Sequence, residues 1–193
     1  MPHDLELLTE YMGGREVTLE RLDELFTTDT KMEGEDVTPD ISGLIGQYVH
    51  GNEPSHHIIY FYTMLGEPWK GADRLYEVMA TMYSAEPDGL SGNEDVGQMS
   101  AWYIMTTLGF YPVEPASGEY VLGVPMVDRA EVDVEGGIFS VVREGYSEHN
   151  RYVQRVELNG KELRRGYITH EEIIAGGELR FVMGAEQTLW YDL

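Results

Sequence analysis

The sequence contains no cysteine and few basic residues, and both shortages limit what the protein can do. Without cysteine, its 193 residues cannot form a disulfide, a thiolate metal site or a cysteine nucleophile. Thirteen Lys and Arg against 35 Asp and Glu give a formal net charge of -22. A surface this acidic repels phosphate backbones and anionic lipids, so neither nucleic acid nor a membrane is an expected partner. It suits a neutral ligand such as a sugar, or a divalent cation.

Two further absences concern membranes and leader peptides. No apolar run reaches the roughly 18 residues that a membrane-spanning helix needs. The acidic start MPHDLELL is unlike a signal peptide, which begins with basic and then apolar residues. The chain is nevertheless 42% hydrophobic and 11% aromatic, so we expect a folded core rather than a disordered chain.

The first 112 residues carry apolar side chains at helical spacing. Leu5, Leu8 and Met12 predict a first helix that ends at Gly13-Gly14. The same spacing predicts four later helices, over residues 19–26, 58–65, 75–83 and 99–110. Residues 27–40 are polar and predict a loop, and residues 41–50 predict a short helix or turn.

From residue 113 onward the pattern changes to short segments of alternating polarity separated by glycine-rich turns. Asn159-Gly160 between two such segments is the clearest hairpin signal. We therefore predict an α+β fold, with helical hairpins over residues 1–112 and a small antiparallel β-sandwich over residues 113–193.

The first cluster of chemically versatile side chains is HGNEPSHH, residues 50–57. It precedes a predicted helix, whose free amides favour an ionised carboxylate on Glu53. That carboxylate, with the neighbouring amide and imidazoles, could hold a hard cation or sugar hydroxyls. The structural alternative is a helix N-cap packed beside two histidines. A zinc site from His50, His56 and His57 is a weaker reading, because no standard zinc spacing is present.

The second cluster is DGLSGNEDVGQ, residues 88–98, which leads into the predicted helix at residues 99–110. Three acids on a glycine-rich loop make an oxygen-rich site of the kind that calcium accepts, although the EF-hand spacing is absent. Asp95 fits either an N-cap or a base, because a helix N-terminus favours its ionised form. Aromatic residues near both clusters, Trp102 among them, can pack against the apolar faces of sugars, but for any one of them filling the core is the more common role. Paired carboxylates beside aromatic rings are what glycoside hydrolysis requires.

These two stretches, HGNEPSHH and PDGLSGNEDVGQMSAWYIMTTLGFYP at residues 87–112, closely resemble signature sequences of glycoside hydrolase family 92. Shorter matches extend the resemblance over the whole chain. They are PHD at 2–4, GQYVH at 46–50, GEPWK at 66–70, YVLGVP at 120–125, LNGKEL at 158–163 and the GGEL-FVMG run at 176–184.

The resemblance implies a calcium-dependent, inverting exo-α-mannosidase, often specific for α-1,2 linkages, with an N-terminal β-sandwich and an (α/α)6 barrel. Within that pattern Asp95 resembles the general base, with Asn93 where many relatives carry a second acid and Glu94 beside it. The implied metal ligands are Asn52, Glu53, Asp95 and Gln98. The implied sugar contacts are His50, Glu53, His56, His57 and Trp102.

The resemblance also implies that a general acid and an N-terminal domain belong upstream of Pro2-His3-Asp4. We therefore expect these residues to be the C-terminal portion of a secreted or periplasmic enzyme and to be inactive alone. The expected partners are an α-mannoside glycan, the N-terminal portion and, because a partial barrel exposes apolar surface, a second copy. The alternative function is a non-catalytic carbohydrate-binding or structural module.

Overall fold

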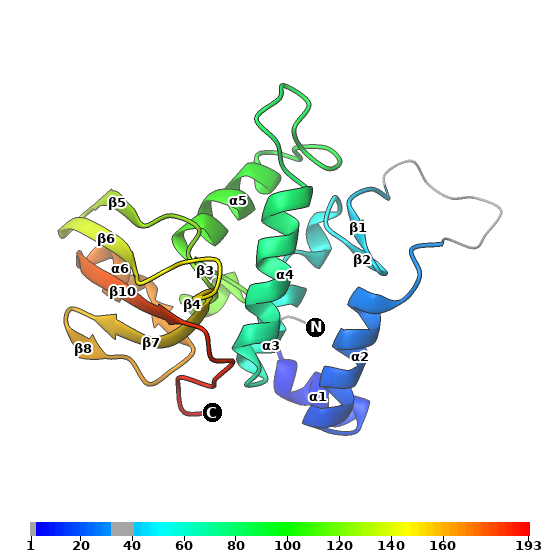
Figure 1. Ribbon diagram of the computed structural model, residues 1–193, viewed down its shortest axis with the longest axis horizontal. Coiled ribbons are helices and arrows are strands. Elements are labelled where there is room, and N and C mark those ends of the chain that lie inside the picture. Colours follow the sequence, from blue (N-terminus) through cyan, green and yellow to red (C-terminus); the bar gives the residue numbers. More distant parts are fainter. Residues whose placement is uncertain (1–2, 32–40) are drawn as a thin grey trace. The chain divides into compact units, whose positions relative to one another are not determined.

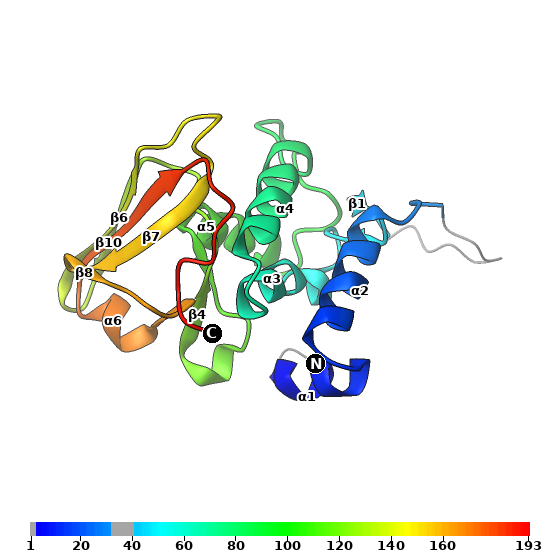
Figure 2. The same cartoon turned by 60° about the horizontal axis from the view of Figure 1, so that its bottom comes forward.

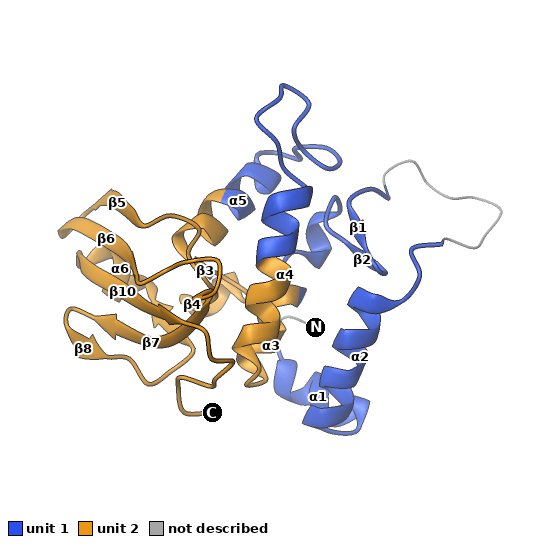
Figure 3. Ribbon diagram, viewed as in Figure 1, with its two compact units in different colours: residues 1–58, 76–103 blue, residues 59–75, 104–193 orange. Residues whose placement is uncertain are grey.

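The computed structural model describes residues 3–31 and 41–193 (Figure 1). The chain divides into two compact units, residues 1–58 with 76–103 and residues 59–75 with 104–193 (Figure 3). Helices α4 (Pro68–Thr81) and α5 (Gln98–Leu108) each contribute residues to both units. The predicted boundary between residues 112 and 113 lies inside the second unit, and a domain division at that point stays a prediction.

The first unit begins with the predicted helical hairpin. Helix α1 (Leu5–Met12) is capped by Asp4, whose carboxylate accepts a hydrogen bond of 2.8 Å from the amide of Leu7. It ends at Gly13, where a left-handed backbone with φ of 101° turns the chain into α2 (Arg15–Thr27). The buried face of α2 carries Thr18, Leu19, Leu22 and Phe26.

Of the short helix or turn predicted over residues 41–50, the turn is present and the helix is not. This segment contains a small hairpin of β1 (Leu44–Ile45) and β2 (Tyr48–Val49), paired antiparallel. Its turn lies against the end of α2, where the Gln47 amide donates to the Leu25 carbonyl at 2.7 Å. A Cβ at Gly46 would come within 2.5 Å of that same carbonyl oxygen, so only glycine fits there. Of the predicted loop over residues 27–40, positions 32–40 lie outside the described residues.

The remaining helical predictions are confirmed with shifted ends. The stretch from residue 58 starts as a 3-10 turn, η2 (Ile58–Tyr60), and continues as α3 (Phe61–Met64), ending before Gly66. Before it lies another single turn, η1 (Glu53–Ser55). Residues 84–97, between α4 and α5, form a long loop (Figure 1).

Besides α3 and its share of α4 and α5, the second unit contains two β-sheets and two short helical turns. A three-stranded sheet has the order β3-β4-β9, and a five-stranded sheet has the order β5-β6-β10-β7-β8. The strands are β3 (Phe110–Tyr111), β4 (Glu119–Leu122), β5 (Arg129–Val134), β6 (Gly137–Glu144), β7 (Tyr152–Leu158), β8 (Lys161–Glu162), β9 (Tyr167–Thr169) and β10 (Gly177–Gly184). The turns are η3 (Pro115–Ser117) and α6 (His170–Ile174). Phe110 of β3 meets Phe139 of β6 edge to face, with ring centroids 6.4 Å apart, so the sheets share a core.

The predicted sandwich is antiparallel in all but one strand pair. Strand β10 lies between β6 and β7 (Figure 2) and pairs parallel with β6, which corrects the prediction. The chain reaches β10 from the other sheet through α6, and this crossover sets its direction. Local alternation of polar and apolar residues indicates which face of the sheet each side chain lies on. It does not indicate whether neighbouring strands run parallel or antiparallel.

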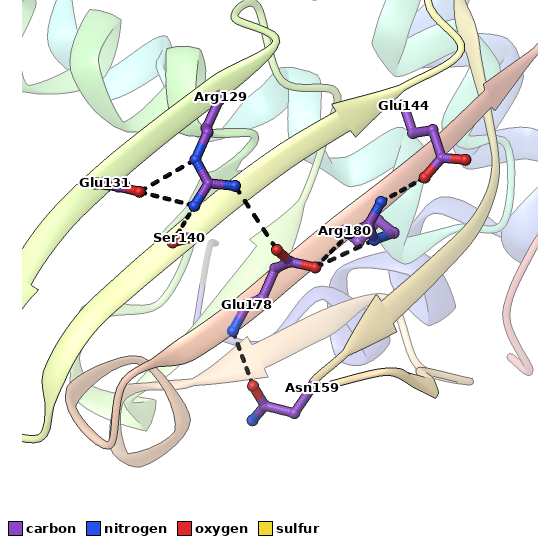
Figure 4. Close-up of polar contacts among 7 residues, drawn as sticks. All are labelled: Arg129, Glu131, Ser140, Glu144, Asn159, Glu178 and Arg180. Atoms are coloured by element: carbon purple, nitrogen blue, oxygen red, sulfur yellow. Dashed lines mark hydrogen bonds and ion pairs between the residues drawn. The ribbon is translucent and has the colours of Figure 1, made fainter.

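The outer face of the five-stranded sheet carries a ladder of charges (Figure 4). Along β10, Leu179, Phe181 and Met183 are buried while the alternate residues point outward. Arg180 bonds Glu178 at 2.7 Å and Glu144 at 2.5 Å, and Arg129 bonds Glu131 at 2.7 Å. This alternation keeps one face of the sheet solvated and the other in the core.

The architecture is thus a mixed α and β fold, as predicted. Whether its helices belong to an (α/α)6 barrel stays a prediction. Across residues 3–31 and 41–193, no helix is both long and apolar enough to cross a membrane.

Candidate active site

Both motif clusters lie in the first unit, and their loops touch. A Cβ at Gly92 would lie 2.7 Å from the carbonyl oxygen of Gly51, and one at Gly51 would lie 2.7 Å from the carbonyl oxygen of Ser91. The two loops can approach this closely only because both positions are glycine. Glu53 follows Gly51 by two residues and Asp95 follows Gly92 by three, so the two acids stand on adjoining loops.

His50 is fully buried. Its Nδ1 is 2.9 Å from the Tyr48 hydroxyl, and its Nε2 is 2.7 Å from the Tyr83 hydroxyl. Burial, together with the neighbouring His56, lowers the pKa of His50 from 6.5 to about 3. At neutral pH this imidazole is therefore uncharged and fully engaged by protein hydroxyls.

His56 is buried as well, and its ring stacks on that of His50 with centroids 4.7 Å apart. Its Nε2 lies 3.0 Å from the His50 carbonyl oxygen, and its Nδ1 lies 3.2 Å from Nε2 of Gln98. Burial lowers its pKa to about 4, partly offset by the hydrogen bond to the His50 backbone. Both histidines are therefore internal groups, and the hydrogen bond between His56 and the His50 carbonyl holds the loop backbone.

Trp102 is the third buried member of this group. Its indole nitrogen donates to the His56 carbonyl at 3.1 Å, and its ring meets His50 with centroids 4.4 Å apart. The side chain is 0% exposed, which does not favour direct stacking on a sugar. The predicted sugar contacts of His50, His56 and Trp102 stay predictions.

Glu94 anchors the start of α5. One carboxylate oxygen accepts from the Ser100 amide at 2.9 Å, and the other accepts from the Ser100 hydroxyl at 2.7 Å. These bonds hold the pKa of Glu94 below its ordinary value. The carboxylate therefore caps the helix from outside its first turn, and the Asp95 carbonyl accepts from the Gln98 amide at 3.2 Å. This arrangement gives Glu94 a structural task, and its predicted catalytic role stays a prediction.

Asp95, Val96 and Gly97 all adopt a left-handed backbone, with φ of 43°, 59° and 87°. A β-branched residue such as valine rarely takes this conformation, which costs on the order of 1–3 kcal/mol. The carboxyl-bearing Asp95 and the neighbouring Asn93 are exposed, as is Asn52 on the other loop. Two of the three predicted catalytic residues, Asp95 and Asn93, are thus accessible, and so is the predicted metal ligand Asn52.

Glu53 carries an unpaired buried oxygen, the feature that bears most directly on a metal. Its Oε1 is buried and has no hydrogen-bond partner among the described residues. A buried carboxylate oxygen without a donor is costly unless a cation or a ligand hydroxyl satisfies it. Asn52 and Gln98 bring amide groups to the same two loops, and His57 is half-buried beside them.

The donor set fits a hard cation better than zinc. The ring nitrogens of His50 and His56 already face protein partners. Within the described ranges, no three His, Asp or Glu side chains gather closely enough to bind one metal ion. Calcium accepts amide, backbone and water oxygens alongside one or two carboxylates, so it does not need such a cluster.

Sequence reasoning missed the tyrosines that hold the histidines. Tyr83 carried only an apolar spacing signal, and Tyr48 was noted only within the GQYVH match. Their hydroxyl bonds arise from the folded arrangement. Ser100 was also missed, although its position six residues after Glu94 is visible in the sequence.

Residues 1–185 match the family model described as the glycosyl hydrolase family 92 catalytic domain. The chain belongs to glycosyl hydrolase family 92. A family 92 α-mannosidase from Bacteroides thetaiotaomicron, solved in complex with mannoimidazole, is 41% identical with a TM-score of 0.81. A family 92 inverting mannosidase from the same organism is 36% identical with a TM-score of 0.80. These matches cover 90% and 96% of this family 92 chain.

A curated relative from Arthroderma benhamiae, described as an uncharacterized secreted glycosidase, is 28% identical over 98% of the chain. The chain spans only about a quarter of these relatives: 23% of the fungal protein, and 23% and 26% of the two bacterial mannosidases. Nearly the whole of this chain supports the family membership. The chain corresponds to only one part of each relative.

Proposed function

We propose that this chain supplies the general-base side of an inverting α-mannosidase active site. The contact between the Gly51 and Gly92 loops carries the proposal, because it brings the two family motifs into one site. The named activity of the bacterial relatives, α-mannosidase for one and inverting mannosidase for another, supports the reaction class.

In this proposal the exposed carboxylate of Asp95 accepts a proton from the attacking water. The water then adds to the anomeric carbon on the face opposite the leaving group, which inverts the configuration. Asn93, on the same loop, would orient the water through a hydrogen bond. Glu53 and His57 would bind hydroxyls of the terminal mannose. The family resemblance implies α-1,2-linked mannose, which is therefore the first substrate to test.

The unpaired Oε1 of Glu53 supports a calcium ion as the cofactor. Asn52, Glu53, Asp95 and Gln98 are the residues proposed to hold it. When bound, such an ion supplies positive charge that orients sugar hydroxyls and favours ionised carboxylates. The zinc alternative loses support because His50 and His56 are paired within the protein.

Inverting hydrolysis also needs a general acid, which protonates the departing oxygen. We propose that this acid comes from outside these residues, because the chain spans about a quarter of its relatives. General acid catalysis is typically worth about 10²–10⁴-fold, so the isolated chain should hydrolyse mannosides very slowly or not at all. Secretion of the whole enzyme and self-association of this chain remain proposals as well, the first supported by the name of the fungal relative.

The test begins with calcium titration of the purified chain by calorimetry. We expect binding in the wild type and a loss of affinity of at least tenfold in Glu53→Gln. The same substitution at Glu186, an exposed acid near the C-terminus, is the matched control and should leave binding unchanged. Equal affinity in wild type and Glu53→Gln would remove the proposed metal site.

Catalysis is tested separately with an α-1,2-mannobioside. The isolated chain should release no mannose above background. Rapid calcium-dependent release would overturn the proposal that the general base lies in this chain and the general acid outside it. In a longer polypeptide that carries these residues with the acid, Asp95→Asn should abolish turnover yet retain sugar binding. Full turnover in that variant would show that Asp95 is not the general base and would favour a non-catalytic, carbohydrate-binding role for these residues within the longer enzyme.

A further inference from the structure

The mechanism proposed above uses neither His50 nor His56, yet both are buried in the segment that carries Glu53. Burying two imidazoles is costly unless each ring nitrogen finds a matching donor or acceptor. The contacts around them determine where each proton lies, and this proton arrangement shows how the two loops are joined.

The proton positions can be worked out from the Met99 carbonyl oxygen, which can only accept a hydrogen bond. The Tyr83 hydroxyl lies 3.2 Å from the Met99 carbonyl oxygen, which can only accept, so Tyr83 donates its single proton there. The Tyr83 oxygen must then accept from Nε2 of His50, 2.7 Å away. Because the fully buried ring is neutral, a proton on Nε2 leaves Nδ1 of His50 unprotonated, and Nδ1 accepts from the Tyr48 hydroxyl at 2.9 Å.

The same reasoning gives the tautomer of His56 and the orientation of the Gln98 amide. The His50 carbonyl accepts from Nε2 of His56 at 3.0 Å, which leaves Nδ1 of His56 as an acceptor. Gln98 must therefore present its amide nitrogen to that atom, 3.2 Å away. The carbonyl oxygen of Gln98 is thereby turned away from His56.

Three of these contacts reach the first turns of α5, at Gln98, Met99 and Trp102. Gln98 and Met99 begin the helix, Trp102 donates to the His56 carbonyl at 3.1 Å, and the Gln98 amide donates to the Asp95 carbonyl at 3.2 Å. The segment from Tyr48 to His56, which leads into and surrounds Glu53, is therefore tied to the helix that follows Asp95.

We propose that Tyr83, His50 and His56 are positioning residues that hold the Glu53 and Asp95 loops in register through two neutral imidazoles protonated on Nε2. We call this hydrogen-bonded group of Tyr83, His50 and His56 the lock. The lock itself is inferred from the hydrogen-bond geometry, and its importance for catalysis rests on the proposed function. Residues that support ligands in this way typically change metal affinity or activity by about 10–100-fold when altered.

The variant that tests the lock is Tyr83→Phe, which keeps the ring against His50 and Trp102 and removes only the hydroxyl. Tyr103→Phe is the matched control, because Tyr103 packs on Tyr83 with ring centroids 4.8 Å apart and is 39% exposed. Nitrogen-15 NMR of the metal-free chain reads the imidazole tautomers directly, and amide spectra report on residues 51–53 and 93–97. Neither measurement depends on mannosidase activity.

We expect both buried histidines to show protonated Nε2 in the wild type. Tyr83→Phe should shift the amide signals of both loops and lower calcium affinity about tenfold, whereas Tyr103→Phe should do neither. An Nδ1-protonated form of either histidine, or loop signals equally unchanged in both variants, would overturn the lock. Absence of calcium binding in the wild type would count against the proposed cofactor and leave the tautomer and loop measurements to decide the inference.

Discussion

The carboxylate of Glu94 accepts two hydrogen bonds from Ser100, one from its amide at 2.9 Å and one from its hydroxyl at 2.7 Å. Together with the bond from the Met99 amide to the Glu94 carbonyl, at 3.3 Å, this closes the intervening residues into a tight loop. The closed loop explains how Asp95 and Val96 are held with positive φ, because strained conformations persist where surrounding bonds over-determine them.

The strain at Val96 leads to the first prediction. Replacing it with asparagine, which tolerates the left-handed region, should raise the free energy of unfolding by about 1 kcal/mol. The valine side chain is fully exposed, so the substitution removes no core packing. Chemical denaturation of both proteins measures the difference.

Val17→Asn is the control for this prediction. Val17 is 37% exposed and lies in α2, where a right-handed helix slightly disfavours asparagine. It should be neutral or destabilising, and a comparable loss of stability in Val96→Asn would contradict the assignment of strain.

The second prediction concerns the start of β10. Gly177 and Gly137 share a left-handed backbone, with φ of 120° and 124°, so alanine strains both. A Cβ at Gly177 would in addition collide with Oδ1 of Asn159, while a Cβ at Gly137 would meet nothing within 4 Å. Gly177→Ala should therefore destabilise the protein by about 1–3 kcal/mol more than Gly137→Ala, as measured by denaturant unfolding.

A double-mutant cycle with Asn159→Gly separates the collision from the backbone strain. Asn159 has φ of 53°, which glycine adopts easily, and its Oδ1 accepts from the Glu178 amide at 2.8 Å. If the collision matters, Asn159→Gly costs less in the Gly177→Ala background than in the wild type. Strictly additive effects would show that backbone strain alone accounts for the loss.

The third prediction is a pH dependence at α6. Thr169 and Glu172 form a capping box, and Arg165 bonds both carboxylate oxygens of Glu172 at 2.5 Å. Burial by itself would raise the pKa of Glu172, but the hydrogen bonds and charge of Arg165 and the amide of Thr169 bring the pKa below 4.5. The ionised form is therefore favoured in the folded state.

The sign follows from that lowered pKa. The stabilisation is fully present above the unfolded value of 4.5 and is lost as the pH falls through the folded pKa. Glu172→Gln should cost about 1–2 kcal/mol at pH 7 and progressively less below pH 4.5. Unfolding measured from pH 7 to pH 3 checks this, with exposed Glu171→Gln as the control. A cost that does not depend on pH would contradict the prediction.

Much of the local structure could be predicted from short-range patterns. The end of α1 at Gly13 and the turn at Asn159-Gly160 were predicted because glycine and asparagine are among the few residues that adopt positive φ. The hairpin over residues 44–49 was missed because its strands are two residues long, too short for alternation to register. The parallel pairing of β10 with β6 was missed because it joins segments far apart in the sequence.

For the candidate site, the sequence by itself determined the family, the two motif loops and the residue types that they bring. These are encoded in contiguous stretches, where spacing alone is informative. Only the tertiary structure decided which polar side chains are buried, where they support the two loops, and which are accessible to a ligand. His50 and His56 share a motif with Glu53, yet burial beside Tyr83 and Trp102 makes them internal hydrogen-bonding groups. The physical reason is that an imidazole's role depends on its surroundings, and those come from residues tens of positions away.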